Sequence, residues 1–232
     1  MPFYEIGSHN RKVFVMQDKK CTILFQGDSI TDCGRASCGG AGFSNDGLGP
    51  GYPGLIAARL LCNRPEVSWK FINRGISGSR TVDLYARWKI DGINLKPDII
   101  TILVGVNDTW HRYCGDNGVE LERAERIYRE ILSWTLEQLP GVHFILMEPF
   151  ALKTGTLSEE DIRLQEVAAR GRFVKKLAGE FRTGFIPCQE LFDHALRRAP
   201  MKHWLHDGVH PTPAGHQLLA DAWLEAAKPL LP

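Results

Sequence analysis

Serine, histidine and aspartate occur in this sequence within short segments of small residues, a pattern that suits acyl transfer. Ser29 follows Gly27-Asp28 and can act as a nucleophile, provided that a base removes its proton. His210 is the candidate base. Asp207 lies three residues before it, close enough in a turn to accept a hydrogen bond from the imidazole and fix its tautomer. These residue types and spacings predict a catalytic triad of Ser29, His210 and Asp207.

Acyl transfer also needs hydrogen-bond donors aimed at the oxygen that becomes negative in the transition state. The backbone N–H of Ser29 is one candidate. The N–H of Gly75 is a second, because a missing side chain lets a substrate approach the backbone, and the side-chain amide of Asn107 is a third. The sequence therefore predicts an oxyanion hole made of Ser29, Gly75 and Asn107. Each residue alone is also a common cap or turn residue, so the prediction depends on their occurring together.

Two other catalytic interpretations fit the residues less well. The segment Gly75-Ile76-Ser77-Gly78-Ser79 is close to the Gly-x-Ser-x-Gly nucleophile motif, although Ser79 replaces the final glycine. A metal-dependent hydrolase is the other, because histidines crowd residues 203–216 and such stretches can bind zinc or iron. Gly208 and Pro211 argue against a regular helix that would align those imidazoles.

Five apolar segments are expected to be the strands that position these residues. They span residues 21–26, 67–73, 98–104, 142–147 and 183–187. The first, third and fourth are nearly continuous in Ile, Leu, Val and Phe, which is typical of strands buried on both faces of a parallel sheet. The candidate residues follow the strands directly. Because ligands bind at the carboxyl ends of parallel strands, the candidates are expected at one edge of the sheet.

Helical patterns fill the gaps between these strands. Helices are predicted over 52–62 and 120–139, from Ser158 toward residue 181, and from Thr212-Pro213 to about residue 227. Alternating strands and helices predict an α/β fold with a parallel sheet. No linker or repeat divides residues 21–232, so they are expected to form one domain. Residues 1–20 lie outside the pattern and are predicted to be an N-terminal extension.

Composition excludes several classes of protein. The 232 residues contain 28 Lys and Arg against 27 Asp and Glu, a formal net charge of +1, so no overall attraction to nucleic acid or to an anionic membrane is expected. No apolar run reaches the roughly 20 residues of a spanning helix, and the N-terminus has no signal-peptide pattern. The six cysteines lack CxxC spacing and are expected to be free thiols. A cytoplasmic location is therefore predicted.

The polar segments together resemble the motif blocks of the SGNH hydrolases, the GDSL esterase and lipase superfamily. The matching blocks, in order, are Gly27-Asp28-Ser29-Ile30-Thr31, Asn73-Arg74-Gly75-Ile76-Ser77-Gly78, Gly105-Val106-Asn107-Asp108 and Asp207-Gly208-Val209-His210-Pro211. The resemblance implies the same triad and oxyanion residues. It also implies a flavodoxin-like three-layer α/β/α sandwich with a five-stranded parallel sheet, and catalysis without a metal or organic cofactor.

A closer resemblance is to the intracellular bacterial acetyl xylan esterases. It is carried by residues 27–35, Gly49-Pro50-Gly51-Tyr52, Ala86-Arg87-Trp88 and residues 105–110. It implies removal of acetyl groups from xylo-oligosaccharides or similar acetylated sugars, and assembly into a homo-oligomer.

Asp28, Tyr52 and Trp110 are expected to contact the substrate. The rings of Tyr52 and Trp110 suit stacking on sugar faces, although both could equally pack beneath the loops. Two alternatives remain. One is a lipase or thioesterase acting on longer acyl chains, and the other is a carbohydrate-binding protein that keeps the fold without turnover.

Overall fold

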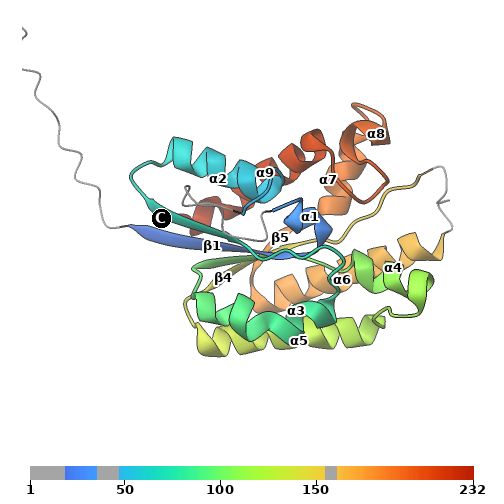
Figure 1. The fold of residues 1–232 in the computed structure, drawn as a ribbon, viewed down its shortest axis with the longest axis horizontal. Coiled ribbons are helices and arrows are strands. Elements are labelled where there is room, and N and C mark those ends of the chain that lie inside the picture. The colour runs from blue at the N-terminus through green and yellow to red at the C-terminus, as the bar shows by residue number, and fades with distance from the viewer. Residues whose placement is uncertain (1–18, 36–46, 155–160) are drawn as a thin grey trace, which may run out of the picture.

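The computed structural model describes residues 19–35, 47–154 and 161–232. Within these ranges five parallel strands form one sheet in the order β2-β1-β3-β4-β5 (Figure 1). The strands are β1 (Lys20–Gly27), β2 (Ser68–Asn73), β3 (Ile99–Leu103), β4 (His143–Met147) and β5 (Gly184–Ile186). The predicted α/β fold with a five-stranded parallel sheet is confirmed.

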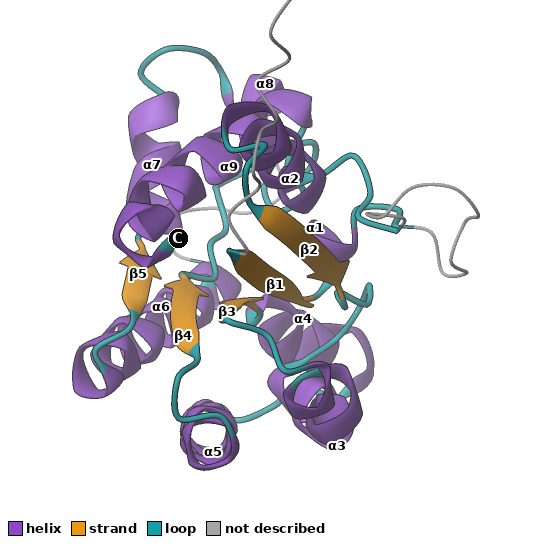
Figure 2. Cartoon of the chain, turned by 90° about the vertical axis from the view of Figure 1, so that its left-hand side faces the viewer, coloured by secondary structure: helices purple, strands orange, loops and turns teal. Residues whose placement is uncertain are grey.

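Helices cover both faces of the sheet. They are α1 (Ser29–Asp32), α2 (Tyr52–Asn63), α3 (Thr81–Asp91), α4 (Val106–Gly115), α5 (Leu121–Gln138), α6 (Ile162–Phe181), α7 (Cys188–Ala195), α8 (Met201–Trp204) and α9 (Pro213–Ala227). In Figures 1 and 2, α2, α7, α8 and α9 lie over one face, whereas α3, α5 and α6 lie over the other. The molecule is therefore a three-layer α/β/α sandwich.

The continuous apolar character of the central strands follows from this layering. Along β1, Ile23 and Phe25 pack into the core beneath α2 and α9, whereas Leu24 packs into the core on the opposite face. All three side chains are fully buried. Because neighbouring side chains of a strand point to opposite faces, and both faces are covered here, three consecutive positions can all be buried and apolar.

Buried tryptophans attach helices of both layers through hydrogen bonds. The indole N–H of Trp223 in α9 donates to Thr101 Oγ1 in β3 at 2.7 Å. On the other side of the sheet, the indole N–H of Trp88 in α3 donates to Thr135 Oγ1 in α5 at 2.8 Å. Each buried N–H thus has a partner, and its large apolar ring can be buried without loss of a hydrogen bond.

Strand and helix boundaries agree with the predicted ones to within a few residues, but several helices are absent from the prediction. Helix α3 was missed because Leu84 and Trp88 are its only buried large apolar residues, among charged neighbours. Helices α4, α7 and α8 were missed for a related reason: they are short, and an apolar stripe needs several turns to be recognised. Helix α6 begins at Ile162, capped by Asp161, whose side chain accepts the N–H of Arg163. The predicted start at Ser158 lies outside the described residues.

Most of the predicted N-terminal extension, residues 1–18, also lies outside the described part, as does Cys38. The other cysteines, Cys21, Cys33, Cys62, Cys114 and Cys188, are free thiols. Across the described ranges, no helix combines the length and apolar character needed to cross a membrane.

Candidate active site

The turn from β1 into α1 positions Ser29. Strand β1 ends at Gly27, where a Cβ atom would lie 2.3 Å from the carbonyl oxygen of Leu103, so only glycine permits this close turn. The Asp28 side chain then caps α1 by accepting the N–H of Ile30 at 3.0 Å. Ser29 is the first residue of α1, and among the described residues its own N–H has no hydrogen-bond acceptor.

The acid and the base come from one tight loop between α8 and α9. A β-bridge between Leu205 and Pro211 closes this loop. Inside it, Asp207 Oδ1 accepts the backbone N–H groups of Val209 at 3.0 Å and His210 at 2.8 Å. The same carboxylate therefore holds the backbone of the turn and leaves its second oxygen for the imidazole.

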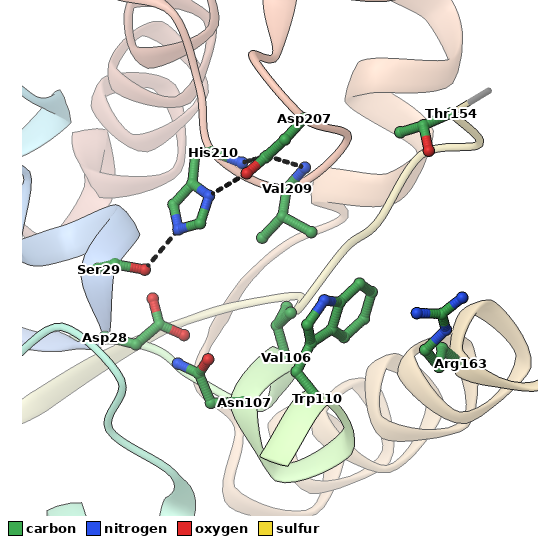
Figure 3. A pocket seen from close by; sticks show the side chains of 10 residues that line it. All are labelled: Asp28, Ser29, Val106, Asn107, Trp110, Thr154, Arg163, Asp207, Val209 and His210. Carbon is green, nitrogen blue, oxygen red and sulfur yellow. Dashed lines mark hydrogen bonds and ion pairs between the residues drawn. The ribbon is translucent and has the colours of Figure 1, made fainter. Parts of the chain in front are cut away.

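Ser29, His210 and Asp207 form a continuous chain of hydrogen-bonding groups (Figure 3). His210 Nδ1 lies 2.7 Å from Asp207 Oδ2, and His210 Nε2 lies 2.8 Å from Ser29 Oγ. Residues 181 positions apart in the sequence are thus joined in one step. The structure brings together all three side chains that the sequence analysis assigned to a triad.

The charge of Asp207 fixes which imidazole nitrogen carries the proton. Partial burial opposes ionisation of Asp207, but hydrogen bonds from the His210 N–H, the His210 ring and the Val209 N–H outweigh it, so its pKa lies below the ordinary value. An ionised carboxylate can only accept, so His210 Nδ1 must donate to it. His210 Nε2 then presents a lone pair to the Ser29 hydroxyl, as a general base requires.

Asn107 lies in the first turn of α4, directly after β3. Its side-chain amide donates one N–H to the carbonyl oxygen of Ser79 at 3.2 Å, which orients the group and leaves its second N–H uncommitted. Asn107 and Ser29 line the same pocket (Figure 3). Asn107 can therefore donate to an oxygen bound beside Ser29.

The placement of Gly75 contradicts its predicted role. The N–H of Gly75 already donates to Asn73 Oδ1 at 2.9 Å, and Gly75 is absent from the lining of the pocket. A Cβ atom at this position would lie 2.5 Å from the backbone nitrogen of Asp32. Gly75 is a glycine because the loop after β2 packs tightly against α1, and its N–H is not available to a substrate.

Gly78, in the same loop, is also absent from the lining of the pocket but differs from Gly75 in its backbone conformation and in its N–H group. Its φ of +83° is in the left-handed region, and among the described residues its N–H has no acceptor. Before it, the Ser77 hydroxyl donates to Asp32 Oδ2 in α1 at 2.6 Å; after it, Ser79 accepts from Asn107. Gly78 is therefore held between the helix that carries Ser29 and the helix that carries Asn107. The signal in the sequence was the second glycine of the same motif block.

A pocket of about 190 Å³ opens beside the Ser29 hydroxyl. It is lined by Asp28, Ser29, Val106, Asn107, Trp110, Thr154, Arg163, Asp207, Val209 and His210 (Figure 3). Of the predicted substrate contacts, Asp28 and Trp110 belong to this lining. The Arg163 guanidinium lies 6.0 Å from the centre of the Trp110 ring, and the two side chains form one wall.

Tyr52, the third predicted substrate contact, lies elsewhere. Its side chain is fully buried behind α1, its hydroxyl lies 2.9 Å from Thr31 Oγ1, and its ring packs edge-on against Phe25. No ligand in the pocket can reach it. The prediction is wrong because Tyr52 begins α2, whose first turn packs into the core rather than facing the edge of the sheet.

The histidines near the C-terminus serve separate partners. His216 is buried, which lowers its pKa to about 4, and its two nitrogens contact the Tyr52 N–H and the Cys33 Sγ, each at 3.2 Å. His203 packs edge-on against Trp204. In the part of the chain that the structure describes, no group of three or more His, Cys, Asp or Glu residues could hold a metal ion.

Comparison with known proteins identifies the family of this chain. The profile of the GDSL-like Lipase/Acylhydrolase family matches residues 25–218. An acetylxylan esterase of Geobacillus stearothermophilus is 37% identical over 206 residues, which cover 87% of this chain and 91% of that protein.

Solved structures extend the similarity. A crystal structure of the Geobacillus stearothermophilus acetylxylan esterase matches with a TM-score of 0.80 at 36% identity, over 91% of this chain and 95% of that one. An alpha/beta hydrolase enzyme from the metagenome of Lake Arreo, Spain, matches with a TM-score of 0.81 at 30% identity, over 94% and 99% of the two chains. The chain therefore belongs to the GDSL-like lipase/acylhydrolase family and is a carboxylic ester hydrolase.

Proposed function

We propose that this protein is a serine esterase that removes short acyl groups, acetyl above all, from acylated sugars such as xylo-oligosaccharides. The observation that carries the proposal is the chain of contacts from Ser29 Oγ through the His210 imidazole to Asp207 Oδ2, at 2.8 and 2.7 Å. That arrangement, at the mouth of a pocket, supports nucleophilic attack on a carbonyl group.

The reaction has two halves. His210 Nε2 takes the proton of the Ser29 hydroxyl while the oxygen attacks the ester carbonyl, and Asp207 stabilises the imidazolium that forms. The imidazolium then gives its proton to the departing sugar oxygen, which leaves an acyl group on Ser29. Water enters, loses a proton to His210 and attacks the acyl group, which releases the free acid and restores Ser29.

The carbonyl oxygen becomes negative in both halves and needs donors. We assign this role to the Ser29 N–H, the free N–H of the Asn107 amide, and the Gly78 N–H in place of that of Gly75. The Ser29 N–H stands at the start of α1 and the Asn107 amide in the first turn of α4, and all three have no competing acceptor among the described residues.

Asn107→Ala is expected to lower kcat on an aryl acetate by about 10²–10³-fold, because one oxyanion donor is lost. Asn107→Asp should be at least as damaging, since it replaces the donor with a negative oxygen. The KM should change far less than kcat, because the interaction strengthens as charge develops. Steady-state kinetics of both variants check this, with the exposed Asn94→Ala as the matched control. Wild-type kcat in Asn107→Ala would remove Asn107 from the oxyanion hole.

The size of the pocket favours small acyl groups. About 190 Å³ accommodates an acetyl group and part of a sugar ring, but not an extended fatty-acyl chain as well. We therefore expect kcat/KM for aryl esters to fall at least about tenfold from acetyl to decanoyl. A matched series of acyl-chain lengths measures this. A rate that rises with chain length would favour the lipase or thioesterase alternative instead.

The sugar part of the proposal is supported by the Geobacillus relative, an acetylxylan esterase, and by Trp110, whose ring lines the pocket. A panel of acetylated xylo-oligosaccharides, assayed for acetate release by wild type and Ser29→Ala, tests it. A carbohydrate-binding protein without turnover would release no acetate and would not react with a fluorophosphonate probe. The same proposal includes a homo-oligomeric enzyme in the cytoplasm, acting without a metal or organic cofactor, with residues 1–20 outside its catalytic domain.

A further inference from the structure

Asp28 is a buried carboxyl group that the reaction scheme above does not use. It is 1% exposed, yet its side chain borders the pocket beside Ser29 (Figure 3). The N–H of Ile30 donates to Asp28 Oδ1 at 3.0 Å. Among the described residues, no other residue donates a hydrogen bond to this carboxyl group. No Arg, Lys or hydroxyl side chain pairs with it there.

The other two carboxyl groups near the site are better compensated. Asp207 binds an imidazole and two backbone N–H groups. Asp108, which is also buried, accepts from the N–H and the hydroxyl of Thr81 and lies 3.9 Å from the Arg170 guanidinium. Asp28 has neither a cation nor a second partner residue, so its charged form is the least stabilised of the three.

The groups that face Asp28 come from three elements. His210 approaches from the loop before α9, Asp108 from α4, and Tyr52 from α2. Burial raises the pKa of Asp28 to about 7; the Ile30 N–H and His210 lower it, and the negative charge of Asp108 raises it. Arg170 faces Asp108 and not Asp28. Since Oδ1 accepts from Ile30, the proton of the neutral acid belongs on Oδ2.

We infer that Asp28 borders the pocket as a neutral carboxylic acid and that loss of its proton inhibits the esterase at alkaline pH. The inference rests on the proposed function. As Ser29 attacks, negative charge develops on the carbonyl oxygen in the pocket that Asp28 borders. A buried carboxylate beside that pocket repels the developing charge, whereas the neutral acid does not.

An ionised Asp28 would also stabilise the imidazolium of His210, which acts in the opposite direction. That contribution is the smaller one, because Asp207 already neutralises the imidazolium at 2.7 Å. The repulsion of the oxyanion directly opposes the stabilisation that the oxyanion-hole donors supply. The kcat/KM profile should therefore have an alkaline limb, because Asp28 ionises as the pH rises through about 7.

The test compares wild type with Asp28→Asn on 4-nitrophenyl acetate, from about pH 5.5 to about pH 9.5, with the enzyme-free rate subtracted. Asparagine keeps an acceptor oxygen for the Ile30 N–H but cannot ionise. The ratio of kcat/KM at pH 9 to that at pH 6 should rise at least about tenfold in Asp28→Asn, because ionisation no longer removes the active form. The control Asp221→Asn removes an exposed carboxylate from α9 and should keep the wild-type profile.

Thermal unfolding gives a second readout that needs no catalysis. The folded pKa of Asp28, about 7, lies above its ordinary value of 3.8, so the folded state binds the proton more tightly than the unfolded state. The stability from that proton is complete below the ordinary pKa and is lost as the pH rises through about 7. The Tm of Asp28→Asn minus that of wild type should therefore increase from about pH 5 to about pH 9.

These readouts separate the inference from the function on which it rests. If wild type hydrolyses no ester, the proposed function fails, but the pH dependence of the Tm difference still reports the protonation of Asp28. An alkaline limb that persists unchanged in Asp28→Asn would overturn the inference. A Tm difference that is constant across the pH range would overturn it as well.

Discussion

Ser29→Ala is expected to lower kcat on an aryl acetate by about 10⁴–10⁶-fold and to leave the fold intact. The substitution removes the hydroxyl that faces His210 Nε2 at 2.8 Å, and with it the acyl-enzyme route. Substrate binding should survive, because the rest of the pocket is unchanged. Steady-state assays with a high enzyme concentration measure the residual rate, and intact-protein mass spectrometry after fluorophosphonate treatment shows whether an adduct forms.

The rival serine provides the matched control. The Ser77 hydroxyl donates to Asp32 Oδ2 at 2.6 Å instead of meeting an imidazole. Ser77→Ala should therefore keep both the probe reaction and most of the turnover, losing no more than a few-fold. If Ser77→Ala abolished the adduct while Ser29→Ala retained it, the nucleophile would be misassigned.

Asp207→Asn is expected to lower kcat by about 10⁴-fold, although it changes a single atom of the side chain. The amide can present its NH₂ group to His210 Nδ1, which selects the tautomer that carries its proton on Nε2. That nitrogen then cannot accept the Ser29 proton, even though the ring keeps its position.

Asp207→Ala separates the effect of the wrong imidazole tautomer from the effect of losing the hydrogen bond between Asp207 and His210. Alanine leaves His210 free to adopt either tautomer, so Asp207→Ala should be no worse than Asp207→Asn despite the larger change in shape. Parallel kcat measurements, with circular dichroism as a check on folding, decide the matter. An Asp207→Asn variant that retains most of the wild-type kcat would contradict the role given to the carboxylate.

The sequence predicted the parts of the structure that depend on local or repetitive patterns. Ile23, Leu24 and Phe25 are consecutive and apolar because both faces of β1 are covered, and that pattern is visible in the sequence. Ser29 and Asn107 could be located because they follow buried strands directly. Helix α3, by contrast, has no clear apolar stripe, because it buries only a few side chains among charged residues.

What could not be predicted is which polar groups remain free. Gly75 and Gly78 lie in one loop, and choosing between their N–H groups requires knowing that the Asn73 side chain turns back to bind Gly75 at 2.9 Å. The burial of Tyr52 depends in the same way on the packing of α2 against α9, where it stacks on the ring of His216. Such contacts join segments far apart in the sequence, and no local pattern encodes them.

The conformation of the loop that carries Asp207 and His210 is determined by contacts within the loop itself. The Leu205–Pro211 bridge and the N–H groups bound by Asp207 fix the acid and the base relative to each other within seven consecutive residues. The rest of the fold therefore has one tertiary alignment to achieve, the approach of this loop to Ser29. A small shift of α8 and α9 would move Asp207 and His210 together. Such a shift changes the distance from His210 to Ser29 but leaves the distance from His210 to Asp207 unchanged.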